Sequence, residues 1–108
     1  MADIDMTVYA DEWIGQAEWR EGKAVEFPDD AARNLEAAKT FRNLAEMLSS
    51  GYAIRGDIVT RINQIADDDD RALAFTLAQS EVDREVGFHF YPETPDDLLE
   101  AVLTRAGA

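Results

Sequence analysis

Residues 12–27 carry the stretch EWIGQAEWREGKAVEF, which decides the fold that we expect for the first quarter of the chain. Small and aromatic side chains alternate there with polar or larger ones, as on the two faces of a β-strand. The residues that share one such face are Trp13, Gly15, Ala17 and Trp19. Glu21-Gly22 then supplies a turn in which glycine can adopt a positive φ, and a short strand follows over 23–27. The stretch therefore predicts a β-hairpin.

A further alternating segment precedes the hairpin, since Ile4, Met6 and Val8 are separated by polar residues. Together these segments predict a three-stranded antiparallel meander. A short fourth strand is expected near 87–91. Helices are expected over 31–49, 57–66, 71–86 and 95–107. The expected fold class is α+β with the order βββαααβα, in which three to four helices pack against one face of the sheet. A chain of 108 residues has the size of a single domain, 1–108.

Acidic residues cluster at the starts of the expected helices, where free amide groups and the helix dipole favour negative charge. The clusters are Asp29-Asp30, Asp67–Asp70 and Asp96-Asp97, and Asp57 can cap the remaining helix. Thr94-Pro95 in front of Asp96-Asp97 has the pattern of a capping box. Gly51 and Gly87 are expected to end helices.

Two of the expected helices have apolar stripes that should face the core. Over 31–49 the stripe consists of Leu35, Ala38, Phe41, Leu44, Ala45, Met47 and Leu48. Over 71–86 it consists of Leu73, Ala74, Leu77, Ala78 and Val82. Trp13 and Trp19 are expected on one sheet face, either buried beneath the helices or partly exposed at an interface.

The chain has 23 Asp and Glu against 10 Lys and Arg, a formal charge of −13. Residues 29–56 hold equal numbers of acids and bases, so the excess lies in the rest of the chain. A hydrophobic fraction of 46% is typical of a globular domain and argues against disorder. Direct binding of nucleic acid is not expected, because the basic residues are dispersed among more numerous acids.

The residue types exclude several kinds of functional site. Absence of cysteine removes disulfides and thiolate metal ligands, and a single histidine, His89, removes two-histidine metal sites. An EF-hand starting at Asp67 fails because Arg71 and Ala78 occupy ligand positions. The scattered glycines form no phosphate-binding loop. We therefore expect no catalytic, cofactor-binding or metal-binding residues, and no enzyme. No apolar run is long enough for a bilayer, so a cytoplasmic location is expected.

The first functional hypothesis is a small acidic inhibitor that imitates nucleic acid and blocks a basic groove on its target. In size and charge the chain resembles small acidic inhibitors of restriction or CRISPR systems, which implies a role in phage or mobile-element defence. A basic protein is then the expected partner. The expected partner-binding residues are Asp11, Glu12, Glu18, Glu21, Glu26, Asp67, Asp68, Asp69, Asp70, Glu81, Asp83 and Glu85.

Two further hypotheses remain open at this point. One is an accessory interaction module (an immunity protein, chaperone or scaffold) that uses the neutral helix over 31–49 or a sheet edge. The other explains the acidity by a saline cytoplasm and assigns no partner. Inhibition by mimicry requires the carboxylates to gather in a coherent patch, whereas the saline explanation predicts that they are dispersed evenly.

Overall fold

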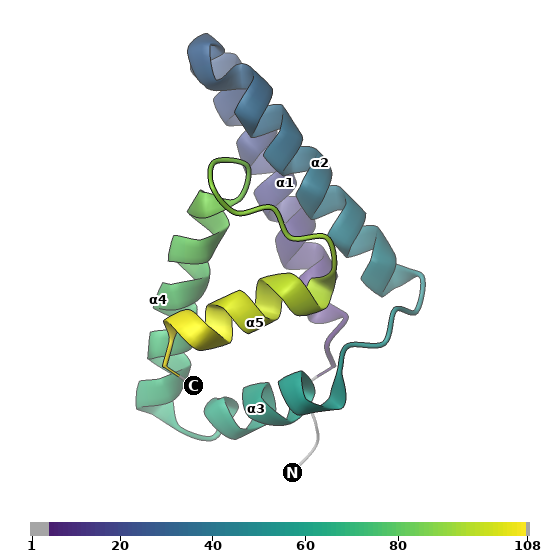
Figure 1. Cartoon of the computed structure of the whole chain (residues 1–108), viewed down its shortest axis with the longest axis vertical. Coiled ribbons are helices and arrows are strands. Elements are labelled where there is room, and N and C mark those ends of the chain that lie inside the picture. The colour runs from purple at the N-terminus through teal and green to yellow at the C-terminus, as the bar shows by residue number, and fades with distance from the viewer. Residues whose placement is uncertain (1–4, 108) are drawn as a thin grey trace.

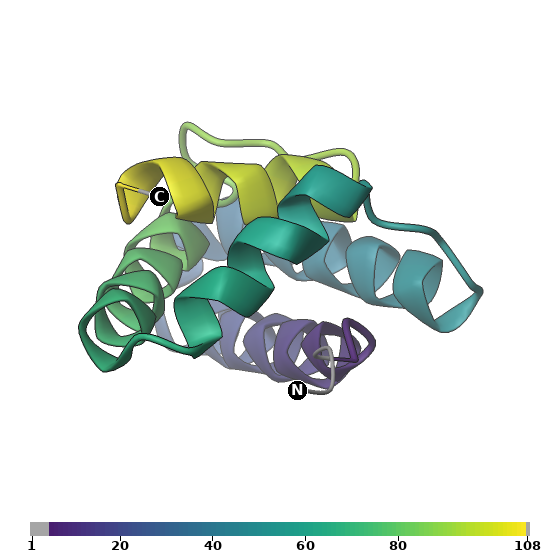
Figure 2. The same cartoon turned by 90° about the horizontal axis from the view of Figure 1, so that it is seen from below.

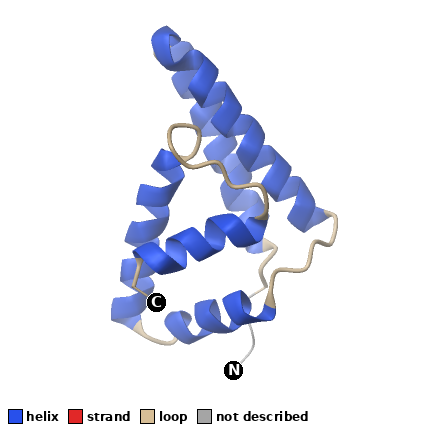
Figure 3. Cartoon of the chain, in the orientation of Figure 1, coloured by secondary structure: helices blue, strands red, loops and turns tan. Residues whose placement is uncertain are grey.

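The computed structural model describes residues 5–107, and its regular structure is helical throughout (Figure 1). Along the chain the elements are α1 (Val8–Glu26), the short 3-10 helix η1 (Pro28–Asp30), α2 (Ala31–Ser49), α3 (Gly56–Ala66), α4 (Asp69–Glu85) and α5 (Pro95–Arg105). Figure 3 shows no strand within the described residues. The β-pairing in that part of the chain is one isolated bridge between Val86 and Phe90.

The expected α+β fold and its order βββαααβα are therefore wrong, because α1 occupies the place of the meander. Ile4, part of the expected first strand, lies outside the described residues. The buried residues of α1 recur three and four positions apart, which is the spacing of a helix face. They are Tyr9, Ala10, Trp13, Ala17, Arg20 and Ala24. Good helix formers such as Ala, Glu, Gln, Lys and Arg make up most of the segment.

The expected turn at Gly22 and the expected fourth strand near 87–91 are also wrong. Gly22 lies inside α1, and it is not among the described glycines with positive φ. Gly87 does have a positive φ of 88°, which turns the chain directly after α4. The amide groups of His89 and Phe90 then donate to the carbonyl of Glu85, 3.2 Å away in each case. This tight turn prevents the extended backbone that a strand requires.

The helices form a hairpin with a second layer packed against it. α1 and α2 lie side by side along their length, and α3 and α5 cross one side of the molecule with α4 at the flank (Figure 1). Figure 2 shows α5 and α1 on opposite sides of the molecule, with α3 running obliquely between their levels. Between the layers is one core whose largest fully buried side chains include Trp13, Phe41, Leu44, Ile58 and Leu103.

Some of the helix bounds and caps agree with those expected from the sequence, and others differ. The expected helix over 31–49 is confirmed as α2, and the expected capping box of α5 is confirmed with Thr94 and Asp97. Asp30 stands at the N-cap of α2 but its side chain forms no capping bond. Asp57 lies in the first turn of α3 rather than at its cap. None of the helices within the described residues is both long and apolar enough to cross a bilayer.

Candidate functional site

A polar groove separates α1 from α4. It consists of two adjoining cavities of about 310 and 190 Å³, which share Gln16, Ser80 and Asp83. The complete lining is Glu12, Gln16, Trp19, Thr76, Gln79, Ser80, Asp83 and Arg84. The groove is therefore built from two helices that are distant in the sequence.

Helical spacing explains why both walls of the groove are polar. On α1, Glu12, Gln16 and Trp19 lie four and three residues apart and so share one face. On α4, Thr76, Ser80 and Asp83 repeat the same spacing. Since neither face is apolar, the two helices do not close against each other as α1 and α2 do. Across the groove, Gln79 Nε2 donates a hydrogen bond to Glu12 Oε2.

Asp83 is a buried carboxylic acid at the base of the groove. Its side chain is 5% exposed, and its Oδ1 atom has no hydrogen-bond partner. Burial raises the pKa of Asp83 to about 7, and the negative charge of Glu12 contributes in the same direction while Arg20 opposes it. Buried carboxylates are ordinarily paired, so an unpartnered one that lines a cavity is a candidate for ligand binding.

Arg20 lies next to Asp83 but is committed to other partners. Its Nη1 donates to Asn34 Oδ1 at 3.1 Å, and its Nη2 donates to the carbonyls of Asp83 and Arg84 at 2.6 and 2.9 Å. No ion pair joins its guanidinium to the Asp83 carboxylate, and its Nε has no partner. Burial lowers the pKa of Arg20, whereas the charge of Asp83 raises it. Arg20 therefore ties α1 to α2 and to the end of α4, and it leaves the Asp83 side chain unpaired.

The predicted acidic residues on α1 divide into two kinds. Asp11 and Glu18 are exposed and lie seven residues apart on the outer surface of the helix, and within residues 5–107 neither forms a salt bridge, although the charge of Glu18 contributes to raising the pKa of Arg42. Glu21 instead binds Arg42 of α2 through two hydrogen bonds of 2.7 and 3.1 Å, which lowers the pKa of Glu21. Glu26 pairs with Lys23 at 3.0 Å. Glu21 and Glu26 are thus the predicted acids of α1 that have a salt bridge within the described residues.

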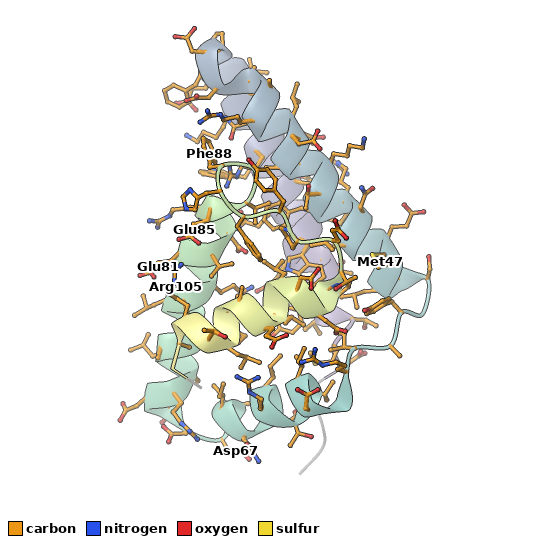
Figure 4. All side chains as sticks on the ribbon, in the orientation of Figure 1. Met47, Asp67, Glu81, Glu85, Phe88 and Arg105 are labelled. Atoms are coloured by element: carbon orange, nitrogen blue, oxygen red, sulfur yellow. The ribbon has the colours of Figure 1, made fainter. Side chains whose placement is uncertain are left out.

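On α4 the predicted acids Glu81 and Glu85 are both held by Arg105 of α5, at 3.1 and 2.7 Å (Figure 4). That contact lowers the pKa of Glu85. Figure 4 places Asp67 at the far end of α4 from this pair. There Asp68 caps the helix by accepting hydrogen bonds from the amides of Asp70 and Arg71. The predicted acids therefore do not gather in one patch, and the two that line the groove are Glu12 and Asp83.

Sequence reasoning missed most of the groove. Gln16, Thr76, Gln79 and Ser80 were not singled out, although their helical spacing would have indicated a shared polar face once both segments were taken as helices. Trp13 and Trp19 do not share a face: six residues are about 240° around a helix. Trp13 is 1% exposed in the core and Trp19 is 50% exposed at one end of the groove.

The groove offers hydrogen-bond acceptors and negative charge, together with an exposed aromatic ring. Such a lining suits a positively charged group with several N–H donors. Among residues 5–107, no group of three or more His, Asp or Glu side chains is arranged to hold a metal ion. Comparison of the chain with protein-family models, with curated proteins and with solved structures found no match.

Proposed function

We propose that the chain is a small, non-enzymatic acidic binding protein that docks on a basic protein partner through α1 and the α1–α4 groove. One observation carries the proposal: Asp11, Glu12 and Glu18 are exposed carboxylates that form no salt bridge within the described residues, and they lie on the same helix as the half-exposed ring of Trp19. Asp11 and Glu18 form one row along α1, and Glu12 and Trp19 form the adjacent row. Carboxylates around an exposed Trp have the composition of a site that receives basic side chains.

The finer form of the proposal is an inhibitor that keeps nucleic acid out of a basic groove on its target, as anti-restriction and anti-CRISPR proteins do. The charge of −13 supports it by steering the protein toward such a groove. Seven residues of helix are about 10 Å, whereas duplex DNA carries a charge every 1.7 Å or so. The acids of α1 would therefore contact separate Arg or Lys side chains without reproducing the phosphate lattice. The cytoplasm, as the compartment of that target, is part of the same proposal.

A charge reversal on α1 tests the docking surface. The probe is a fluorescent Arg- and Lys-rich peptide, whose binding is measured at about 50 mM and about 300 mM salt. We expect the double variant Asp11→Lys/Glu18→Lys to weaken binding about tenfold or more at low salt. The matched control, Glu36→Lys/Glu46→Lys on α2, makes the same charge change at exposed positions and should weaken binding much less. Equal losses in the two variants would contradict a docking surface on α1.

A test of the inhibitor form of the proposal requires the physiological partner. Basic proteins captured from host cells at low salt should bind nucleic acid, and adding this chain should release that nucleic acid in a competition assay. A captured partner that binds the chain and nucleic acid simultaneously would overturn the inhibitor form and leave the acidic docking surface standing.

A second candidate function is an interaction module that binds through an apolar surface. Leu73 and Leu77 favour it, because they lie one turn apart on α4 and are 59% and 58% exposed. In that case binding would be nearly insensitive to salt and would be lost in the variant Leu73→Ser/Leu77→Ser. The sheet edge expected for such a module is excluded, since the described residues contain no strand.

A further inference from the structure

We infer that the groove between α1 and α4 is a binding site for a single guanidinium group, with an arginine side chain of a basic partner as its ligand. The inference deepens the proposed function and rests on it for the source of that arginine. It concerns the base of the groove, where Asp83 lies, and not the outer carboxylates of α1.

One carboxylate oxygen at the base of the groove, Asp83 Oδ1, has no hydrogen-bond partner. Asp83 Oδ1 is buried without a hydrogen bond in a side chain that is 5% exposed, yet the residue lines both cavities of the groove. Most buried polar atoms in folded proteins have a partner, and an atom without one calls for an explanation such as a functional role or a bound species. A donor that enters the groove from outside would supply the missing hydrogen bond.

The chemistry of the surrounding residues indicates a cation with several donors. Glu12 provides a second carboxylate, and Gln16, Gln79 and Ser80 provide neutral oxygen acceptors in the same groove. Trp19 lies at one end with half of its surface exposed. A guanidinium is planar, presents five N–H donors and stacks on aromatic rings, whereas an ammonium has only three donors on one nitrogen. The lining therefore fits arginine better than lysine.

Internal cations contact the ring of Trp19, because Arg20 Cζ and Lys23 Nζ lie 5.6 and 5.4 Å from its centroid, but no salt bridge joins either of them to the Asp83 carboxylate. Arg20 directs its Nη atoms to Asn34 and to backbone carbonyls, as described above. Arg84 lies on the rim and is exposed. The titratable and charged groups that face Asp83 are Glu12 and Arg20 of α1, with Arg84 beside it on α4. The Asp83 Oδ1 atom thus has no internal hydrogen-bond partner that an external donor would have to displace.

Binding at this site should depend on pH in a defined direction. The pKa of Asp83 is raised to about 7 by burial and by Glu12, so the carboxyl is partly protonated at neutral pH. A bound guanidinium favours the ionised form and lowers that pKa. Affinity should therefore rise as the pH increases through 7, with release of a proton on binding.

The test is an NMR titration of the full chain with N-acetyl-arginine methylamide, which carries one guanidinium and no other charge. We expect saturable shifts of the Trp19 indole and of the Gln16 and Gln79 side-chain amides. Affinity should rise several-fold between about pH 6 and about pH 8, and should fall about tenfold in Asp83→Asn. Glu12→Gln, at an exposed position, should weaken binding less. The matched control Glu36→Gln on α2 should bind as the unaltered chain does.

Three outcomes would overturn the inference: no saturable shift, an affinity unchanged in Asp83→Asn, or shifts centred on Asp67–Asp70. A lysine analogue and free spermidine are titrated in parallel arms. Stronger binding of spermidine than of the arginine probe would assign the groove to a small polyamine and overturn arginine as the ligand. The outer docking surface is judged separately, because a basic peptide that still binds Asp83→Asn but not Asp11→Lys/Glu18→Lys would refute only the groove site.

Discussion

α4 and α5 start in the same way but differ in what they bury. Both begin with acidic residues and a side-chain cap, Asp68 on α4 and Thr94 on α5. α5 then buries the apolar residues that its sequence pattern selects, namely Leu98, Leu99, Val102 and Leu103. α4 leaves Leu73 and Leu77 more than half exposed and buries Asp83. The expected apolar stripe of this helix is wrong at both leucines.

The difference follows from the neighbours of the two helices. α5 packs against α2, α3 and α4, so its apolar face is covered from several directions. α4 lies at the flank, where Phe75, Ala78 and Val82 reach the core and the adjacent face meets the polar row of α1. Natural sequences tend to break local rules at functional sites, and the buried Asp83 is such a break in the lining of the candidate groove.

The largest expected effect is in the core beneath α5. Leu103→Ala should lower the free energy of unfolding by about 2–5 kcal/mol, because Leu103 is fully buried and its removal leaves a cavity. Leu77→Ala, the matched change on the exposed face of α4, should stay within about 0.5 kcal/mol. Urea unfolding followed by circular dichroism measures both. Comparable losses would mean that α4 buries its leucines as α5 does.

The glycines that end the two helices should respond differently to alanine. Gly87 after α4 and Gly107 after α5 both have positive φ, of 88° and 77°. A Cβ at Gly87 would lie 2.9 Å from Ala37 Cβ and 2.9 Å from the Arg33 carbonyl, whereas at Gly107 it would meet nothing within 4 Å. Gly87→Ala should therefore destabilise by about 2–4 kcal/mol and Gly107→Ala by about 1 kcal/mol. Equal thermal shifts would contradict the close approach of Gly87 to α2.

Asp83, which α4 buries, should make the stability of the chain depend on pH. Its folded pKa of about 7 is above the unfolded value of 3.8, so between these values the native state holds a proton that the unfolded state has lost. Its contribution to stability therefore falls as the pH rises from about 4 to about 7. Asn does not titrate. Asp83→Asn should gain on the order of 2–4 kcal/mol relative to the unaltered chain between about pH 4.5 and about pH 8.

The free energy of unfolding is measured for both proteins at several pH values in that range. A difference between them that does not change with pH would show that Asp83 has an ordinary pKa and is not buried as described. The control is Asp69→Asn, an exposed acid in the first turn of the same helix. Its stability difference from the unaltered chain should stay small at each pH.

The smallest expected effects are at the caps, where α4 and α5 should behave alike. Asp68→Ala and Thr94→Ala each remove a side chain that accepts hydrogen bonds from the first turn. Each should lower the free energy of unfolding by about 1 kcal/mol. A loss at one cap only, measured by thermal unfolding, would show that the two helices differ at their starts as well as in their buried faces.

The helical segments after residue 30 were predictable because their determinants are local. The capping box at Thr94 and Asp97 spans four residues, and the glycine after α4 acts on its own turn. The first quarter of the chain was not predictable in this way. Alternation of Trp13, Gly15, Ala17 and Trp19 fits a strand. The residues that α1 actually buries have helical spacing but include the charged Arg20, which a sequence pattern assigns to the surface.

The candidate site could be predicted only in part. Glu12 and Asp83 were both among the predicted acids, but nothing in the sequence places them across one groove or makes Asp83 differ from its neighbours. The contact of Arg20 with the carbonyl of Asp83 joins residues 63 positions apart. Patterns of three to seven residues carry no information about such a pairing.

By itself the sequence determined the large negative charge, the absence of thiol chemistry and several helix ends, since these depend on composition or on hydrogen bonds within one turn. Only the tertiary structure decided that α1 is a helix buried against α2, that Leu73 and Leu77 face outward, and that Asp83 is shielded from water. Burial and pKa depend on which distant elements meet, and that choice minimises the free energy of the whole chain rather than of any one segment.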